Sequence, residues 1–345
     1  MPGEAVAVYA LTPQGAMLGR RLADALAAEL YTPFALAEAN RATGFASLPS
    51  LMAEIFTSRS AHVFIAACGL VVRAVAPHLR GKDRDPAVVV LDQAGRHAIS
   101  LLSGHLGGAN ELARRVAALT GGEPVITTAT DCLGLPSFDV IARDLGLAID
   151  NLEAVKHLNA ALITGERIMI FDPAGRLARV EGLLAGRVDW AASPENLPWD
   201  APCLIVDWRE RNLGPRHLAL RPKVLAVGVG CRKGAGAKAV LELIRAALVA
   251  KRLSPLSVRV LASIEAKRGE PGILEAAAAL GVQTIFFSAH ELGAASPPNP
   301  SAMVAKHMGV SSVCEAAAMC AAGTTRLLAT KIKSGTATAA VALDV

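Results

Sequence analysis

The stretch KVLAVGVGCRKGAG, residues 223–236, shows how the last third of this chain folds. An apolar run over 223–227 predicts a buried strand, the glycines of 228–236 predict a tight loop, and a helical pattern follows from about Gly236 to Ala250. Glycines let a ligand approach the backbone closely, and a helix N-terminus offers unpaired N–H groups to an anion. We therefore expect an anion-binding loop, with a plain strand-to-helix connection as the alternative.

The spacing of these glycines argues against the two common nucleotide-binding motifs. The loop lacks the G-x-x-x-x-G-K-[ST] spacing of a P-loop. It has G-x-G-x-x-x-G in place of the dinucleotide pattern G-x-G-x-x-G, and no acidic residue follows a second strand at the usual distance. An α/β nucleotide-binding enzyme is therefore disfavoured.

The first third of the chain alternates strands and helices in the same way. Thr12-Pro13 opens a helical pattern that we expect to run to about Leu30, because proline suits the first helical turn. The residues Asp92–Arg96 predict a hairpin turn between two strands. Further strands are expected at 5–11, 62–67, 88–91, 98–102 and 124–127, with helices at 48–56, after Gly69 and up to Leu119. This alternation predicts a layered α/β domain.

Three domains follow from the pattern. The middle of the chain contains all three tryptophans and several prolines, with helices expected near 140–145 and 151–162 and strands at 167–171 and 203–206. We expect an α/β fold with two layered domains, 1–134 and 223–345, joined by a smaller mixed α/β middle domain and linker over 135–222. In the last domain, further helices are expected at 272–280 and 311–321, and further strands at 284–287, 326–329 and 338–343.

Length and composition are consistent with this picture. The 345 residues are 52% hydrophobic but only 4% aromatic, with a mean hydropathy of +0.40. The longest apolar run, His62 to Val72, is far shorter than the roughly 18 residues that a membrane-spanning helix needs. No basic flank leads into an apolar segment at the N-terminus. We therefore expect a cytoplasmic protein without a membrane partner.

The net charge of +5 is unevenly distributed. Residues 1–222 contain 21 Lys and Arg against 23 Asp and Glu, whereas residues 223–345 contain 14 against 7. A basic domain can attract nucleic acid, an anionic membrane or a small acidic ligand. Because the basic residues form no run of five and are interleaved with Ala and Gly rather than aromatic residues, nucleic acid is not the expected partner.

The six cysteines form no C-x-x-C pair and match no zinc motif. We therefore expect free, mostly buried thiols and no protein-bound metal.

Three further segments could support chemistry. Glu265 and Lys267 would share a face only on a strand, and either an acid–base residue or an ordinary ion pair fits them. Ser103, His105 and Asn110 lie in a loop that opens a helix, where His105 could be a general base or a surface histidine beside a helix cap. Lys331 and Lys333 project from one face of a strand, which a solvated edge strand would also explain.

Together these segments resemble the CbiG family, the cobalt-precorrin-5A hydrolases of anaerobic cobalamin biosynthesis. The resemblance covers nearly the whole chain, in the family's order, and the middle is its least characteristic part. It differs at His290, where we expect an acidic residue in many relatives. It rests on five segments: FIAACGLVVRAVAPHL (64–79), SGHLGGANELA (103–113), VGVGCRKGAG (227–236), ASIEAKRGEPGILEAAAALG (262–281) with FFSAHEL (286–292), and VCEAAAM (313–319) before LLATKIKSGTATAAVAL.

The resemblance implies a hydrolase that opens the ring A δ-lactone of a cobalt-bearing tetrapyrrole with water and releases acetaldehyde. It also implies that cobalt arrives with the substrate, so that the protein needs no cofactor of its own. A non-catalytic protein that binds or hands over corrinoid intermediates is the alternative. Contacts with neighbouring pathway enzymes are compatible with both the hydrolase and this alternative.

The residue roles follow from chemistry rather than from the resemblance. Such a substrate carries many carboxylates, which Arg, Lys and backbone N–H groups bind well. Glu265 is the first candidate for the base and His105 the second. The expected substrate contacts are Gly228, Gly230, Arg232, Lys233, Gly234, Lys267, Lys331, Ser103 and Asn110.

Overall fold

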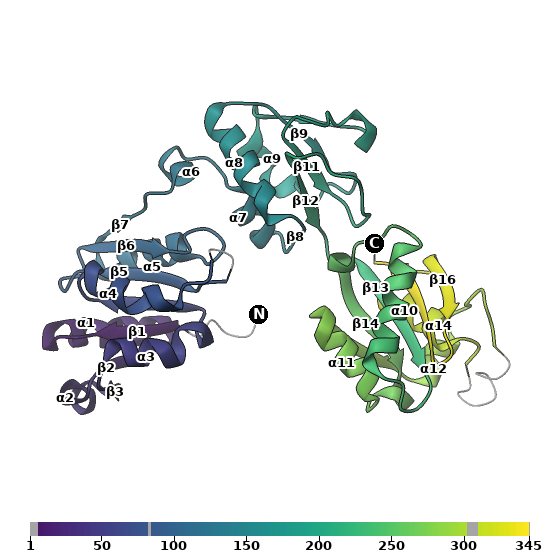
Figure 1. Cartoon of the computed structure of the whole chain (residues 1–345), viewed down its shortest axis with the longest axis horizontal. Helices are drawn as coiled ribbons and strands as arrows, with labels where there is room; N and C mark the ends of the chain where they lie inside the picture. Colours follow the sequence, from purple (N-terminus) through teal and green to yellow (C-terminus); the bar gives the residue numbers. More distant parts are fainter. Residues whose placement is uncertain (1–5, 82–83, 302–309, 345) are drawn as a thin grey trace. The chain divides into compact units, whose positions relative to one another are not determined.

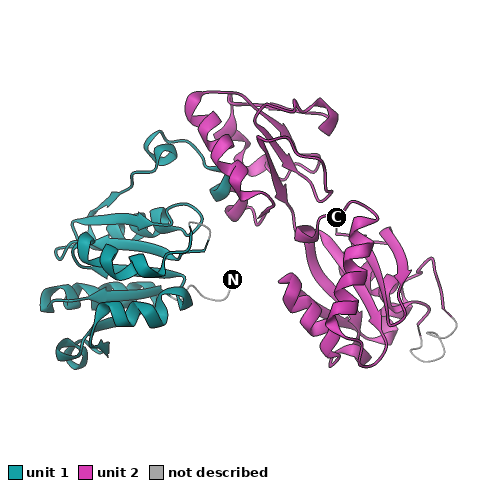
Figure 2. Cartoon of the chain, in the orientation of Figure 1, with its two compact units in different colours: residues 1–140 teal, residues 141–345 magenta. Residues whose placement is uncertain are grey.

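The computed structural model describes residues 6–81, 84–301 and 310–344. The chain folds as two compact units, residues 1–140 and 141–345 (Figure 2). The first unit is built on a seven-stranded sheet, and the second contains two five-stranded sheets (Figure 1). Helices accompany all three sheets, which confirms the predicted α/β fold with two layered domains and a smaller mixed domain between them.

The sheet of the first unit has the strand order β3-β2-β1-β4-β5-β6-β7. Strands β6 and β7 run antiparallel to the other five, through the predicted hairpin between β5 and β6. Helices α1 and α5 pack on one face and α3 and α4 on the other, each burying an apolar side against the sheet. The strands are β1 (Val6–Ala10), β2 (Glu29–Pro33), β3 (Thr43–Phe45), β4 (Ala61–Ile65), β5 (Ala87–Leu91), β6 (His97–Leu102) and β7 (Glu123–Val125). The helices are α1 (Pro13–Leu26), α2 (Phe34–Ala37), α3 (Leu48–Ile55), α4 (Cys68–Val75), α5 (Ala109–Thr120), α6 (Ala129–Cys132) and α7 (Phe138–Asp144), the last crossing into the second unit.

The first helix begins where the sequence predicts but ends early. The Thr12 side chain accepts a hydrogen bond from Gly15 N at 3.1 Å and so caps the helix. Ala27 adopts a left-handed conformation with φ 52°, which ends the helix at Leu26. The prediction of a helix to Leu30 is therefore wrong, because the chain turns there to pair β2 with β1.

The second unit begins with the middle sheet, whose order is β10-β9-β11-β12-β8. Its strands pair in parallel except β8, which is antiparallel to β12. The strands are β8 (Ala148–Ile149), β9 (Ile168–Phe171), β10 (Val188–Trp190), β11 (Cys203–Val206) and β12 (His217–Arg221), with helices α8 (Val155–Thr164) and α9 (Glu181–Leu184).

The C-terminal sheet has the order β15-β14-β13-β17-β16, with β13, β14 and β15 parallel. Helices α10 and α11 pack on one face, and α12 and α14 on the other. The strands are β13 (Leu225–Cys231), β14 (Val258–Ile264), β15 (Gln283–Phe287), β16 (Leu327–Lys333) and β17 (Ala337–Leu343). The helices are α10 (Ala237–Val249), α11 (Pro271–Leu280), α12 (Ala289–Gly293) and α14 (Val313–Ala322).

Strand β13 is longer than the sequence predicts. It continues through Gly228 and Gly230 to Cys231, because β17 pairs with it along its whole length. The prediction that the loop starts at Gly228 is therefore wrong. At Gly228 a Cβ atom would lie 1.8 Å from the Cys314 carbonyl oxygen of α14, so only glycine permits this close packing of helix on strand.

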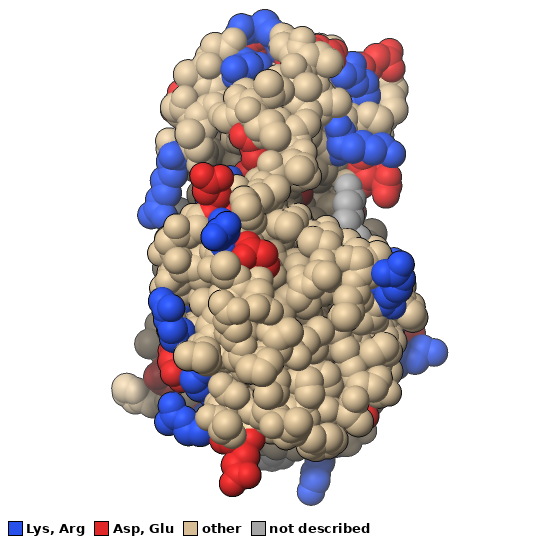
Figure 3. All heavy atoms as spheres, turned by 90° about the vertical axis from the view of Figure 1, so that its left-hand side faces the viewer, with Lys and Arg blue, Asp and Glu red and all other residues tan. Residues whose placement is uncertain are grey.

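Three further features concern the helices, the surface charge and the thiols. Within the described part of the chain, none of the helices has the length and hydropathy to cross a bilayer. On the face drawn in Figure 3, positive and negative side chains lie scattered around a broad uncharged area. All six cysteines are free thiols, as predicted, but only Cys203 and Cys314 are buried, so the prediction of mostly buried thiols is wrong.

Candidate functional site

Several of the predicted site residues meet at one edge of the C-terminal sheet. The loop after β13 carries Arg232 and Lys233, and Glu265 directly follows β14. Strand β16 runs parallel to β13, so Lys333 at its end belongs to the same edge. Open α/β sheets bind their ligands at the carboxyl ends of parallel strands. We refer to Arg232, Lys233 and Glu265 as the C-terminal edge.

The glycine loop at this edge binds a carboxylate that belongs to the protein. Gly234 N donates a hydrogen bond to Glu270 Oε1 at 2.6 Å, and Lys267 Nζ lies 3.3 Å from Glu270 Oε2. The backbone hydrogen bond from Gly234, aided by Lys267 and Lys233, lowers the pKa of Glu270. The loop is thus suited to anions, but its Gly234 N–H and the nearby Lys267 ammonium already bind the Glu270 carboxylate. Arg232 and Lys233 are exposed.

Gly228 and Gly230 lie within β13 rather than in this loop. Gly228 is buried beneath α14, and a Cβ at Gly230 would lie 2.7 Å from Thr338 Oγ1. Their small size therefore serves packing, and contact with a substrate is not needed to explain either glycine.

Glu265 and Lys267 belong to one turn of 3-10 helix, Glu265–Lys267, so they do not share a strand face. Glu265 Oε1 lies 3.3 Å from Arg268 Nη2, and both side chains are more than half exposed. This is the ordinary ion pair of the alternative interpretation, and it leaves the Glu265 carboxylate accessible to a ligand. Lys267 instead points to Glu270 and is buried.

Lys331 is likewise held within the protein. Its Nζ donates to the Asn299 carbonyl oxygen, and its backbone N–H donates to Glu315 Oε1 at 2.8 Å. Glu315 is fully buried on α14 and also accepts hydrogen bonds from Asn299. Glu315 and Glu270 were not among the site residues expected from the sequence. A single acid within the alanine run VCEAAAM is the signal that could have revealed Glu315.

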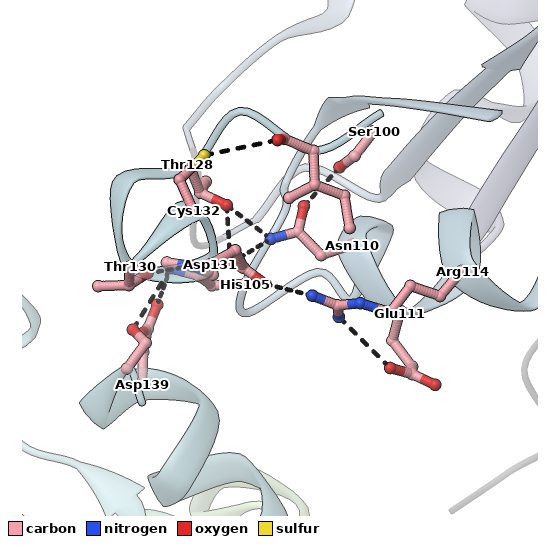
Figure 4. Close-up of polar contacts among 12 residues, drawn as sticks. Ser100, His105, Asn110, Glu111, Arg114, Thr128, Thr130, Asp131, Cys132 and Asp139 are labelled. Atoms are coloured by element: carbon pink, nitrogen blue, oxygen red, sulfur yellow. Dashed lines mark hydrogen bonds and ion pairs between the residues drawn. The ribbon is translucent and has the colours of Figure 1, made fainter. Parts of the chain in front are cut away.

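His105, the second candidate base, lies in the first unit between two carboxylates (Figure 4). Its Nε2 is 3.1 Å from Asp131 Oδ2 and from Thr130 Oγ1, and its Nδ1 is 3.5 Å from Asp139 Oδ2. The loops that follow β6 and β7 bring His105 and Asp131 together at one edge of the sheet, and α7 supplies Asp139. We call His105, Asp131 and Asp139 the His105 cluster.

The two carboxylates favour the charged form of the imidazole. The hydrogen bond to Asp139 is the largest cause of a raised His105 pKa, and Asp131 adds to it against the opposing effect of burial. Burial alone would raise the pKa of Asp139, but hydrogen bonds from His105 and Ser137 lower it to about 2. The two carboxylates stabilise the protonated imidazole, which has no free lone pair, so this geometry favours a proton donor or a structural ion over a general base.

Ser103 and Asn110 support the same loop. Asn110 is buried, donates through Nδ2 to Thr128 Oγ1 and Asp131 Oδ2 at 2.9 Å, and accepts from Ser100 Oγ at 2.7 Å. The Ser103 carbonyl accepts Ala109 N–H at 3.1 Å at the start of α5. These contacts position Asp131 beside His105 rather than present Asn110 to a ligand.

The His105 cluster predicts a distinctive pH dependence of stability. Since the Asp139 pKa is depressed to about 2, the contribution of Asp139 to the free energy of unfolding should be present above pH 4 and lost as the pH falls toward 2. Since the His105 pKa is raised, its contribution should be present below about pH 6.5, the ordinary histidine value, and lost as the pH rises through the folded value. The stabilisation that the His105 cluster itself contributes should therefore be largest between about pH 4 and 6.5. Denaturant titrations read by pulsed hydrogen exchange would measure this, and His105→Gln should remove the alkaline decline. The same decline in the variant would refute the assignment.

Residues 6–81, 84–301 and 310–344 contain no group of three or more His, Cys, Asp or Glu side chains placed to hold a metal ion.

The fold and the C-terminal edge define a class of protein. Open α/β sheets with charged side chains at the carboxyl ends of parallel strands are typical of proteins that bind small acidic molecules. Three family models match the chain in order: Cobalamin synthesis G N-terminal over residues 50–131, Cobalamin biosynthesis central region over 136–222, and Cobalamin synthesis G C-terminus over 225–342. The chain belongs to the CbiG family.

Curated relatives agree with this assignment. A cobalt-precorrin-5A hydrolase of Priestia megaterium is 35% identical over 306 residues, which cover 86% of this chain and 82% of that protein. A cobalt-precorrin-5A hydrolase of Salmonella typhimurium is 34% identical over 319 residues, 90% of each chain. Among solved structures, a chain from Sulfolobus solfataricus named "putative cobalamin biosynthesis protein G homolog" is 22% identical, with a TM-score of 0.37 and coverage of 99% of this chain and 98% of the other, and the assignment does not rest on it.

Proposed function

We propose that this protein is a cobalt-precorrin-5A hydrolase. The observation that carries the proposal is its 35% and 34% identity to two proteins of that name, over 86% and 90% of the chain. The excess of basic residues in 223–345 and the exposed Arg232 and Lys233 suit a substrate that carries many carboxylates.

In the proposed reaction, one water adds across the acyl–oxygen bond of the ring A δ-lactone and yields a carboxylate and an alcohol. The alcohol then loses its proton, and the bond from its carbon to the macrocycle breaks. The electron pair passes to the macrocycle, a proton is taken up, and acetaldehyde leaves. A base is needed to activate water, and donors are needed to stabilise the lactone oxyanion.

We assign these roles to the C-terminal edge. Glu265 is an accessible carboxylate at the end of β14 and acts as the base, while the exposed Arg232 and Lys233 bind substrate carboxylates. We further propose that the substrate brings the cobalt, that the protein needs no cofactor of its own, and that neighbouring pathway enzymes dock to exchange intermediates.

The direct test is to incubate the purified protein with cobalt-precorrin-5A and trap volatile aldehyde. Acetaldehyde formed in proportion to substrate consumed is the expected result. Tight binding without acetaldehyde would instead identify a corrinoid-binding or handover protein.

Replacing Arg232 by alanine should mainly weaken substrate binding. The Arg232 N–H donates to the Thr336 carbonyl at 2.8 Å, a backbone contact that the substitution keeps, so the loop should retain its shape. Loss of one charge-assisted contact of about 1.5 kcal/mol corresponds to a KM about tenfold higher with kcat nearly unchanged. Steady-state kinetics beside Arg245→Ala, which removes an exposed arginine from α10, would measure it. An unaltered KM would argue against this role.

A further inference from the structure

The second unit contains a pocket of about 550 Å³ that lies apart from the C-terminal edge. One wall comes from residues 194–217 of the middle domain, and the other from Lys251 and Arg252, which follow α10. Helix α10 begins just after the glycine loop and has 13 residues, so it separates this pocket from that loop by roughly 20 Å. The pocket is therefore a second location for a ligand.

Backbone hydrogen bonds join the two walls. Glu210 N donates to the Arg252 carbonyl at 2.7 Å, and Ser254 N donates to the Trp208 carbonyl at 2.8 Å. Arg209 and Leu253 form an antiparallel bridge between them. The pocket is thus a defined part of the fold, of a volume typical of small-molecule sites.

One side of the pocket is apolar and contains an aromatic platform. Leu197, Trp199 and Ile205 line it, and Trp199 is 56% exposed although indole rings are normally well buried. His217 packs edge-on against Trp199 with ring centroids 5.9 Å apart, and its Nε2 donates to the Pro198 carbonyl at 2.9 Å. A buried histidine therefore holds the tryptophan in place while one surface of the indole remains open to the pocket.

The other side is cationic. Arg209, Lys251 and Arg252 line the pocket, and no carboxylate pairs with their side chains in the described part of the chain. The acids in the lining, Glu195 and Glu210, are fewer than its basic residues. Arg252 has φ 53°, the left-handed conformation that ends the turn after α10, where Leu253 N donates to the Leu248 carbonyl at 2.9 Å.

We propose that this pocket binds a flat, largely apolar ring system that carries carboxylates. The ring lies against Trp199, and the carboxylates contact Lys251, Arg252 and Arg209. The choice of a tetrapyrrole as the ring system rests on the proposed function, whereas the pocket itself requires only the ring and its acids.

The first experiment titrates the full chain with uroporphyrin I, a metal-free porphyrin with eight carboxylates, and follows tryptophan fluorescence. The expected result is saturable quenching that Trp199→Phe largely abolishes and Trp190→Phe retains. Trp190 is the matched control, because it is also exposed, at 45%, and does not line the pocket. Equal quenching in the Trp199→Phe variant would overturn the proposal.

The second experiment tests the cations by direct binding, with uroporphyrin I absorbance as the signal. The double variant Lys251→Gln/Arg252→Gln should raise the Kd at least tenfold, whereas Lys238→Gln/Arg245→Gln, which removes the same charge from exposed positions on α10, should change it less than threefold. A porphyrin with four cationic substituents should bind at least tenfold more weakly, and benzenehexacarboxylate should not compete at equal concentration. Equal losses in both double variants would overturn the proposal, because they would indicate general charge attraction.

These results separate the two proposals. If acetaldehyde is not formed but uroporphyrin I still quenches Trp199, the hydrolase assignment fails and the pocket stands. If acetaldehyde is formed and the pocket variants bind uroporphyrin I normally, the pocket assignment alone fails.

Discussion

Replacing Glu265 by glutamine should lower the turnover of cobalt-precorrin-5A at least about 100-fold, because a neutral amide cannot accept a proton from water. The carboxylate lies at the carboxyl end of β14, one strand away from the loop with Arg232 and Lys233. Glutamine keeps the size of the side chain and loses only the exposed ion pair with Arg268, which contributes little to stability. The fold should therefore survive, and KM should change little.

The kinetic comparison needs two companion variants. Glu275→Gln removes an exposed acid from α11 in the same unit, and its turnover should stay within threefold of the wild type. Arg268→Gln removes the partner of Glu265 but leaves the base, so it should cost far less than Glu265→Gln. If Glu265→Gln keeps its turnover, Glu265 is not the base.

Replacing Gly228 by alanine should destabilise the second unit by about 3 kcal/mol or more, the upper range for overpacking a well-packed core. The added methyl would meet backbone atoms of α14, at 1.8 Å from the Cys314 oxygen and 2.6 Å from the Ala318 nitrogen. Backbone atoms cannot rotate away as a side chain can, so the helix would have to move off β13. That movement would open the apolar contacts of α14 with the sheet.

Urea denaturation followed by circular dichroism and tryptophan fluorescence would measure this loss, since Trp208 packs against the core of the C-terminal sheet. The matched control is Gly293→Ala in α12, where an added methyl meets nothing within 4 Å. It should be neutral or slightly stabilising. A loss below 1 kcal/mol for Gly228→Ala would show that α14 tolerates displacement.

Some features of the fold were predictable from local sequence. Thr12-Pro13 predicted the start of α1, and the run before Gly228 predicted a buried strand followed by α10. Such signals are local, because helix caps, prolines and apolar periodicity act within a few residues. The end of α1 was predicted less well, since the left-handed Ala27 follows from the need to return the chain to β2.

The features of the candidate site can likewise be separated into those that the sequence predicts and those that depend on the tertiary structure. The sequence by itself determined the α/β class, the order of the family's motifs and the residue types that suit an acidic substrate. Only the tertiary structure decided that Glu270 occupies Gly234 N–H and Lys267, that Lys331 is held by Asn299, and that His105 lies between Asp131 and Asp139. The physical reason is that the two residues of each contact are separated by 26 to 36 positions in the sequence, with the exception of Lys267 and Glu270. Their contacts depend on strand order and helix packing, which no local pattern records.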